Sequence, residues 1–252
     1  MLVVEGPHDK RVFLDRTLAR QQVIVSGGRK LLLAAHQVAQ QKNVDRLLFL
    51  ADCDYDIPLK LLTPAKGMVI TEHADLEADL LACGGWNRLI SILIPETLDD
   101  DDRFEEIVSQ VIFRTTALAE VVGRYRRVAR VHAFKAETDV RYGKYRTSKD
   151  NVDEDKLARA LWQNSSDCPL NFADLVAKMN DIDRTYDNCN GHDLVAALSH
   201  VLREDFGLRG HDAESLETLL RSSISDRDFA KWSAVQRIHR WEQENGFVLL
   251  AR

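Results

Sequence analysis

Short apolar runs alternate with amphipathic segments through the first 95 residues, and this alternation restricts the fold more than any other feature of the sequence. Five runs have the length and composition of buried strands: Leu2–Glu5, Val23–Val25, Arg46–Asp52, Met68–Ile70 and Leu89–Ile94. Helical spacing of apolar residues predicts helices at Asp9–Gln21, Lys30–Gln41 and Ala74–Leu81. Strands separated by helices are typical of a mostly parallel sheet flanked by helices. We therefore predict an α/β domain over residues 1–95.

The rest of the chain has mainly helical patterns. Apolar residues recur at every third or fourth position from Phe104 to Val122, which predicts a long amphipathic helix. Shorter helices are predicted at Glu154–Gln163, Asn171–Asn180, His192–Asp205, Ala213–Ser223 and Asp226–Glu244. Pro95 and the acidic run Asp99–Asp102 mark a loop between the two patterns. The expected organisation is thus an α/β domain at residues 1–95 and a mainly helical region at residues 96–252.

The composition argues against several classes of protein. A formal net charge of −6 is not that of a protein that coats nucleic acid non-specifically, although it allows a local basic patch. The apolar runs are shorter than a membrane span, and no secretory signal pattern is present. The four cysteines stand far apart without a C-x-x-C pair, which argues against a disulfide framework or a zinc site. We expect a cytoplasmic protein with no membrane partner.

Acidic residues follow two of the predicted strands at the point where each strand ends. Glu5 follows the first strand and precedes Gly6, and Asp52 and Asp54 close the strand that begins at Arg46. Because the carboxyl ends of parallel strands meet at one edge of a sheet, these carboxylates would share a crevice. Clustered carboxylates repel one another unless a cation binds, and hard oxygen ligands suit Mg²⁺ or Mn²⁺. Either motif alone is equally well read as ordinary turn residues, but their pairing favours a metal site.

Three segments carry acidic and glycine motifs in a fixed order: LVVEGPHDK (Leu2–Lys10), GGRK (Gly27–Lys30) and LLFLADCDYD (Leu47–Asp56). Over residues 1–95 they resemble a Toprim domain, the metal-binding fold of topoisomerases, primases and the overcoming-lysogenization-defect (OLD) nucleases. Two more segments, ITEHADLEADLL (Ile70–Leu81) and NGHDLVAAL (Asn190–Leu198), are similar to the DUF4435 branch of OLD-like Toprim proteins. Many members of that branch are paired with an ABC-type ATPase in bacterial antiphage defence, including the toxin subunit of the PARIS system.

The resemblance implies roles for individual acidic residues. Glu5 matches the family glutamate that serves as metal ligand or general acid/base, and Asp9 matches the second acid of that motif. Asp52 and Asp54 match the D-x-D metal ligands. Glu77 matches an acidic position on the following helix, where it would bind a second ion. A solvated helix carboxylate is the alternative interpretation of Glu77.

Other motifs leave alternatives open. His192 stands where OLD-like nucleases tend to have a Gly-Lys pair, and a histidine there could donate a proton or a positive charge to the scissile phosphate. The same residues, Gly191–Asp193, also fit the start of a helix. Gly27–Lys30 could cradle a phosphate at a helix start or form an ordinary strand-to-helix turn. Asp56 is interpreted as a turn residue before Pro58.

A local reversal of charge lies between Arg124 and Lys149, where nine basic residues and only two acids occur. Tyr125, Tyr142 and Tyr145 are interleaved with them. Basic side chains neutralise phosphates and tyrosines stack on unpaired bases, so the segment predicts a nucleic-acid surface. The residues assigned to that surface are Arg124, Arg126, Arg127, Arg130, Lys135, Arg141 and Lys144. A solvated surface or a dock for an acidic partner is the alternative.

The resemblance implies a Mg²⁺- or Mn²⁺-dependent nuclease that cleaves RNA, with tRNA among the candidates, or DNA. It would be the toxin of an antiphage defence system, controlled by an ABC-type ATPase partner, and a homodimer is compatible with it. The alternative is a non-catalytic subunit with a degenerate Toprim site that binds an ATPase. Retention of Glu5, Asp52 and Asp54 favours the nuclease.

Overall fold

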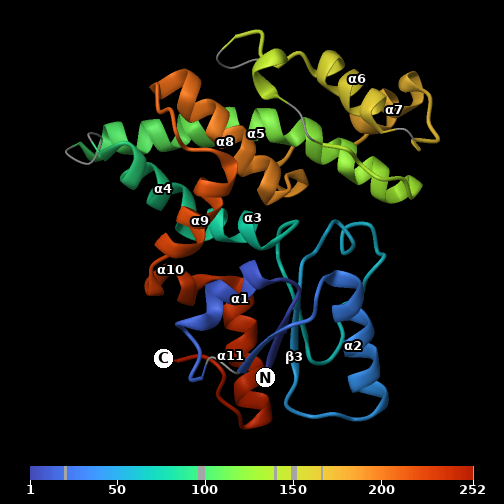
Figure 1. Cartoon of the computed structure of the whole chain (residues 1–252), viewed down its shortest axis with the longest axis vertical. Helices are drawn as coiled ribbons and strands as arrows, with labels where there is room; N and C mark the ends of the chain where they lie inside the picture. Colours follow the sequence, from blue (N-terminus) through green and yellow to red (C-terminus); the bar gives the residue numbers. More distant parts are fainter. Residues whose placement is uncertain (20–21, 96–99, 139–140, 149–151, 166, 252) are drawn as a thin grey trace. The chain divides into compact units, whose positions relative to one another are not determined.

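The computed structural model describes residues 1–19, 22–95, 100–138, 141–148, 152–165 and 167–251. The chain divides into two compact units, of which the first comprises Met1–Gly84 with Arg221–Arg252 and the second comprises Gly85–Leu220. The ribbon is coloured along the sequence in Figure 1. Among the described residues, no helix is long and apolar enough to cross a membrane.

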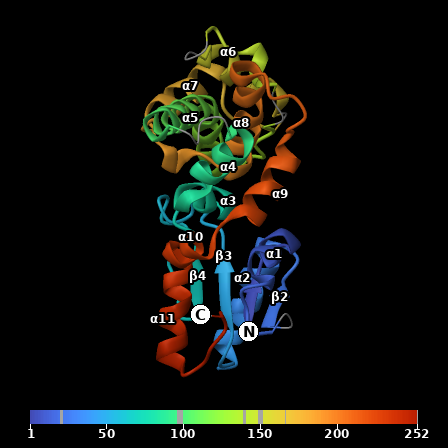
Figure 2. The same ribbon diagram turned by 90° about the vertical axis from the view of Figure 1, so that its left-hand side faces the viewer.

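A four-stranded parallel sheet forms the centre of the first unit (Figure 2). Its strands are β1 (Leu2–Val4), β2 (Val23–Val25), β3 (Leu48–Ala51) and β4 (Met68–Ile70). They lie in the order β2-β1-β3-β4, with Leu2 aligned to both Val23 and Leu48. All four match predicted strands, and the prediction of an α/β fold with a mostly parallel sheet is confirmed.

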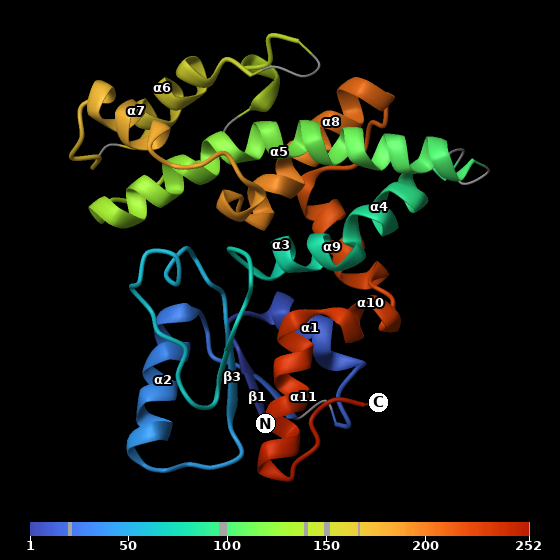
Figure 3. The same ribbon diagram turned by 180° about the vertical axis from the view of Figure 1, so that it is seen from behind.

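Helices cover both faces of this sheet. The helix α2 (Arg29–Gln41) packs Leu32 and Ala39 against Val3, Phe49 and Ala51. Because β2 and β3 lie on opposite sides of β1, right-handed connections place α1 (Pro7–Leu14) on the other face. The C-terminal helix α11 (Ser233–Asn245) packs against β4, and Figure 3 shows α2 and α11 on opposite sides of the strands.

The C-terminal segment returns to the first unit, which differs from the expected division at residue 95. The Phe13 ring of α1 stacks on Trp232 and meets the edge of Phe229 in α10 (Asp226–Lys231). The backbone amide of Leu18 donates to the carbonyl of Leu249 at 3.1 Å. The helix expected over residues 226–244 is interrupted at Trp232, whose extended backbone separates α10 from α11. Packing between aromatic residues far apart in the sequence therefore places this segment in the first unit.

The second unit is helical among its described residues. Its helices are α4 (Trp86–Leu93), α5 (Asp101–His132), α6 (Glu154–Asn164), α7 (Phe172–Asn180), α8 (Gly191–Phe206) and the greater part of α9 (Ala213–Ser223), with short 3-10 turns at Tyr142–Lys144 and Tyr186–Asn188. The long helix α5 packs along α8 and also contacts α4, α6 and α7. At Gly123 of α5, a Cβ atom would lie 1.7 Å from the carbonyl oxygen of Asn188, so glycine is required for this close approach. The predicted long helix is confirmed and extends in both directions.

Two details of the sequence prediction need correction or limitation. The strand expected at Leu89–Ile94 is wrong, because this run lies in α4 and its end. Trp86, Leu89, Ile90 and Leu93 are buried at helical spacing, and a short apolar run fits a buried strand or a buried helix equally well. In the predicted loop at Asp99–Asp102, Asp99 lies outside the described residues. Asp100 caps α5 by accepting a hydrogen bond from the amide of Arg103 at 3.0 Å.

Candidate metal centre

The sheet order creates a switch point between β1 and β3. The chain leaves β1 toward β2 on one side and returns to β3 on the other, and ligands of open α/β sheets bind beyond the carboxyl ends of strands at such a point. Glu5 follows β1 directly, and Asp52 follows β3. The side-chain oxygen Oε1 of Glu5 accepts a hydrogen bond from the backbone amide of Asp52 at 3.0 Å. The prediction that the two acidic motifs meet at one edge of the sheet is confirmed.

Arg29 is a member of this site that the sequence analysis did not assign to it. Gly27 and Gly28 precede it with φ angles of 91° and 112°, a region that side-chain-bearing residues rarely adopt. Their amides donate to the carbonyl oxygen of Glu5 at 3.2 and 2.9 Å. This double contact holds the start of α2 beside the end of β1, and the Arg29 side chain therefore reaches the acidic cluster.

The Arg29 guanidinium contacts three carboxylates. Its Nη2 donates to Oδ2 of Asp56 at 2.7 Å, and its Nη1 lies 3.3 Å from Oε1 of Glu5. Its Nε lies 3.4 Å from Oδ2 of Asp54, and Nη1 also donates to the backbone carbonyl of Asp52. Asp56, interpreted from sequence as a turn residue, thus also contributes a buried carboxylate to the cluster. Oxygen atoms from both acidic motifs converge on one positively charged group.

The loop after β3 holds Asp54 in an uncommon backbone conformation. Asp54 and Tyr55 have φ angles of 45° and 68°, in the left-handed region that is uncommon for residues other than glycine. The amide of Asp54 donates to the carbonyl of Ala74 at 2.8 Å. The amide of Leu61 donates to the carbonyl of Asp56, also at 2.8 Å. Uncommon backbone conformations that are fixed by neighbouring contacts concentrate at functional sites. The Asp54 carboxylate keeps 43% of its side-chain surface exposed, so it remains accessible to a ligand.

Asp52 is held in an unfavourable electrostatic environment. Its Oδ1 accepts a hydrogen bond from the amide of Leu76 at 3.1 Å, at the start of α3 (Leu76–Leu80). Burial raises the pKa of Asp52 well above its usual value, and repulsion from Asp75 and Glu5 adds to the effect. Burial also raises the pKa of Glu5, although the Asp52 amide and Arg29 oppose the change. Repulsion from neighbouring carboxylates therefore adds to the burial that disfavours the ionised form of Asp52.

The other predicted acids near this edge have protein partners. Asp9 accepts a hydrogen bond from the Gly6 amide at 2.8 Å and so caps α1, while burial raises the pKa of its carboxyl. Glu77, on α3, accepts two hydrogen bonds on Oε1 from Arg221, at 2.8 and 2.6 Å. Both side chains of that pair are buried, so a second metal ion at Glu77 would have to share this carboxylate with Arg221. The metal role of Glu77 stays a prediction.

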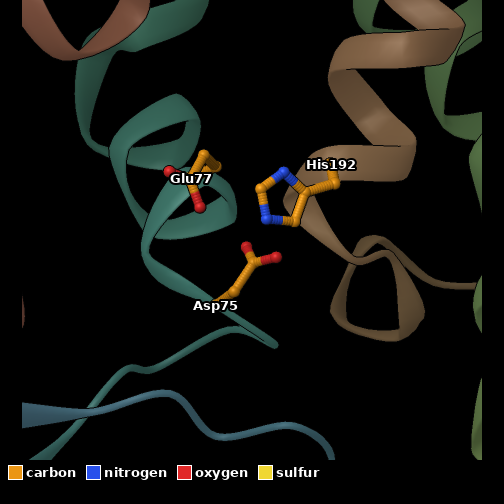
Figure 4. A group of neighbouring side chains, drawn as sticks. All are labelled: Asp75, Glu77 and His192. Carbon is orange, nitrogen blue, oxygen red and sulfur yellow. The ribbon is translucent and has the colours of Figure 1, made fainter. Parts of the chain in front are cut away.

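Asp75 is a further buried acid that the sequence analysis did not assign to the site. It caps α3, with Oδ1 accepting a hydrogen bond from the amide of Ala78 at 2.9 Å. Figure 4 shows Asp75 just before α3 and Glu77 on this helix. Of the neighbouring charges, Asp75 raises the pKa of Asp52 most, so it contributes to the repulsion described above. In the sequence, an aspartate directly before a helical pattern is a typical helix cap, and this was the signal that could have drawn attention to Asp75.

His192, the third residue drawn in Figure 4, belongs to the second unit and begins α8 with Gly191. The Asn190 side chain caps this helix by accepting a hydrogen bond from the His192 amide at 3.1 Å. Within the same unit, Nδ1 of His192 is 2.5 Å from Oε1 of Glu217. The expected helix start at Gly191–Asp193 is confirmed, and the proposed catalytic role of His192 stays a prediction.

One member of the predicted nucleic-acid surface, Arg124, is wrong because it belongs to the core of the second unit. Arg124 is 1% exposed and pairs with Glu120 at 2.7 Å and Glu154 at 2.8 Å. Arg126 donates two hydrogen bonds to the Asp193 carboxylate, at 2.6 and 3.0 Å. Arg124 is buried and paired, so it cannot neutralise the phosphates of a nucleic acid in this fold and is removed from the predicted surface. Arg126 keeps 27% of its side-chain surface exposed, and its role stays a prediction although its charge is paired with Asp193.

Two of the three tyrosines are also unsuitable for stacking on bases. Tyr125 and Tyr142 are buried, with their hydroxyls donating to the carbonyls of Leu161 and Asp193 at 3.1 and 3.4 Å. Arg127 is half-buried and donates to the side chain of Asn188 at 2.9 Å. The exposed members of the predicted surface are Arg130, Lys135, Arg141 and Lys144, and Lys149 lies outside the described residues. These four basic residues keep their predicted role.

Comparison with known proteins adds no assignment. No family model matches this chain, and no curated protein is significantly similar to it. What the chain does must therefore be inferred from the arrangement of its own residues.

Proposed function

We propose that the chain is a divalent-metal-dependent nuclease of the Toprim type that its sequence resembles, cleaving phosphodiester bonds of RNA or DNA. The observation that supports this most strongly is the convergence of Glu5, Asp54 and Asp56 on one cationic group at the switch point of the sheet. The Asp52 carboxylate lies at the same edge and is subject to repulsion from its neighbours. Carboxylate oxygens in this density are the ligands that Mg²⁺ and Mn²⁺ prefer.

The donor set fits a divalent cation in charge as well as in chemistry. Three carboxylates contact a single guanidinium, so negative charge remains in excess around Arg29. Burial raises the pKa of Asp52 most, and the nearby carboxylates, Asp75 first among them, raise it further; a bound divalent cation would offset this repulsion. Glu5, Asp52 and Asp54 would hold the metal ion, and Asp9 would support Glu5 through the Gly6 turn.

The chemistry divides between the metal and the protein. A bound Mg²⁺ neutralises charge on a phosphoryl group and lowers the pKa of a bound water. Burial raises the pKa of the Glu5 carboxyl, a direction that favours proton exchange with an oxygen of the substrate. The Asp54 carboxylate is partly exposed, and its negative charge would repel a polyanionic substrate unless a metal ion is bound.

Incubation of the purified protein with labelled tRNA, single-stranded DNA and duplex DNA tests this function. Cleavage of at least one substrate is expected in Mg²⁺ or Mn²⁺, and none is expected in EDTA. The substrate that is cut decides between RNA and DNA. Cleavage that persists in EDTA, or intact substrates under every metal condition, would count against the proposal. The second outcome would favour the non-catalytic subunit instead.

The exposed basic residues of the second unit are proposed to bind the substrate. Replacing Arg130, Arg141 and Lys144 with glutamate should weaken binding to labelled tRNA or DNA by at least about tenfold. Each lost phosphate contact means that fewer counterions are released from the nucleic acid on binding. The wild-type affinity should also fall as salt rises. A matched control carries the same charge change at other exposed positions of the unit, Lys156, Lys178 and Arg209. If both variants lost the same affinity for nucleic acid, the net charge of the protein would explain the effect, and the proposed surface would be contradicted.

Control by an ABC-type ATPase partner, in the manner of the antiphage systems that the sequence resembles, is the regulatory part of the proposal. A nuclease with an assembled metal site endangers its own cell unless its activity is restrained. A homodimer would bring two such sites to one substrate. These partners rest on the sequence resemblance and stay predictions.

A further inference from the structure

The contacts of Arg29 are of two kinds. Its hydrogen bond to Asp56 is 2.7 Å long, and the Asp56 side chain is 4% exposed. Its contacts with Glu5 and Asp54 are longer, at 3.3 and 3.4 Å, and the Asp54 side chain is 43% exposed. Charge-assisted hydrogen bonds are usually shorter than about 2.9 Å. Among its carboxylate contacts, Asp56 is therefore the firm partner of Arg29 and Glu5 and Asp54 are looser ones, while the carbonyl of Asp52 also holds Nη1.

The geometry at Nε supports this distinction. Among the described residues, Nε of Arg29 is buried and makes no hydrogen bond, although Asp54 lies 3.4 Å away. The contact with Asp54 is consequently one of charge without good hydrogen-bond geometry. Arg29 can therefore give up its weaker contacts with Glu5 and Asp54 while its hydrogen bond to Asp56 keeps the guanidinium in place.

We propose that Arg29 is a substrate-positioning residue, anchored by Asp56, which stands in for the divalent cation at Glu5 and Asp54 in the metal-free protein and binds a phosphate of the nucleic acid once the metal takes those two carboxylates. This inference rests on the proposed function and deepens it by assigning the residue that receives the phosphate. A metal ion held by Glu5 and Asp54 would compete with the guanidinium for the same oxygens, because both are cations.

A phosphate is the anion that this group is suited to receive. The planar guanidinium presents its donors as a fork that matches phosphate oxygens, which a lysine cannot do. Arg29 is also the first residue of α2, a helix of 13 residues, and it follows Gly28, which has open space where a Cβ atom would lie. With Asp56 still bound, the donors released from Glu5 and Asp54 would face the site where the metal and the scissile bond meet.

Manganese titration by calorimetry tests the exchange. Arg29→Met removes the competing charge, so Mn²⁺ should bind at least about tenfold more tightly than to the wild type. At saturating Mn²⁺, the same variant should show a KM for nucleic acid raised by at least about tenfold, because the phosphate contact is lost. Lys42→Met is the matched control: Lys42 is exposed at the opposite end of α2, and its loss should change neither value.

The outcomes separate this inference from the function on which it rests. If the wild type binds Mn²⁺ and Arg29→Met binds it no more tightly, the role of Arg29 is overturned while the metal site stands. If neither protein binds Mn²⁺, both proposals fail. Should Arg29→Met not fold, Arg29→Lys keeps a charge beside Asp56 without the fork, and an unchanged KM in that variant would overturn the phosphate contact.

Discussion

Replacing Glu5 with glutamine is expected to lower metal-dependent cleavage by a factor on the order of 10²–10⁴ while the fold survives. Glutamine has the same length, and its side-chain oxygen can still accept the hydrogen bond from the Asp52 amide. The change removes the negative charge that would hold the metal and the carboxyl that would exchange a proton. It also relieves repulsion of Asp52, so the melting temperature should stay unchanged or rise slightly.

The control for this substitution is Asp45→Asn. Asp45 is an exposed acid shortly before β3, at the opposite edge of the sheet from Glu5. Its loss changes the net charge of the protein by the same amount and should leave cleavage at the wild-type rate. Initial rates at fixed Mg²⁺, with circular dichroism to verify folding, make the comparison. Wild-type activity in a folded Glu5→Gln variant would contradict the assigned role of Glu5.

Replacing Arg124 with methionine is expected to destabilise the second unit by about 3–5 kcal/mol. Methionine fills much of the same space, but the buried Glu120 carboxylate loses the partner that contacts it at 2.7 Å. Burial already raises the pKa of Glu120, and Arg124 opposes that change, so removal of Arg124 leaves a buried charge uncompensated. Glu154 loses a contact of 2.8 Å as well.

Arg130→Met is the matched control on the same helix. Arg130 is exposed, and substitutions at exposed positions usually change stability by less than about 0.5 kcal/mol. Urea unfolding of the two variants measures the difference. Equal, small losses of stability would contradict the placement of Arg124 in the core and would return it to the predicted nucleic-acid surface.

The sheet was predictable because its signals are local. Each strand is a short apolar run that ends at a turn, and Glu5 and Asp52 stand directly after two of them. Adjacent parallel strands then bring such residues together without further information. The α4 segment lacked a comparable signal, because a run as short as Leu89–Ile94 has no periodicity that separates a buried helix from a buried strand.

The remaining features depend on contacts between residues far apart in the sequence. Arg221 pairs with Glu77 across 144 positions, and no local pattern indicates that pairing. Arg126 forms an ion pair with Asp193, 67 positions away. A count of the basic residues in one segment therefore overestimated the charge that is available to a nucleic acid. Arg29 was noticed as part of a glycine-rich turn, but its reach to Asp56 requires the folded loop after β3.

Titration of the purified wild-type protein with Mn²⁺ tests most directly whether this edge of the sheet is a metal centre. We predict binding that EDTA reverses and that Asp54→Asn weakens by at least about tenfold. Asparagine tolerates the left-handed backbone found at residue 54, so that variant should fold. Asp45→Asn should bind as the wild type does. A wild type that does not bind Mn²⁺, or an Asp54→Asn variant that binds it equally tightly, would contradict the account.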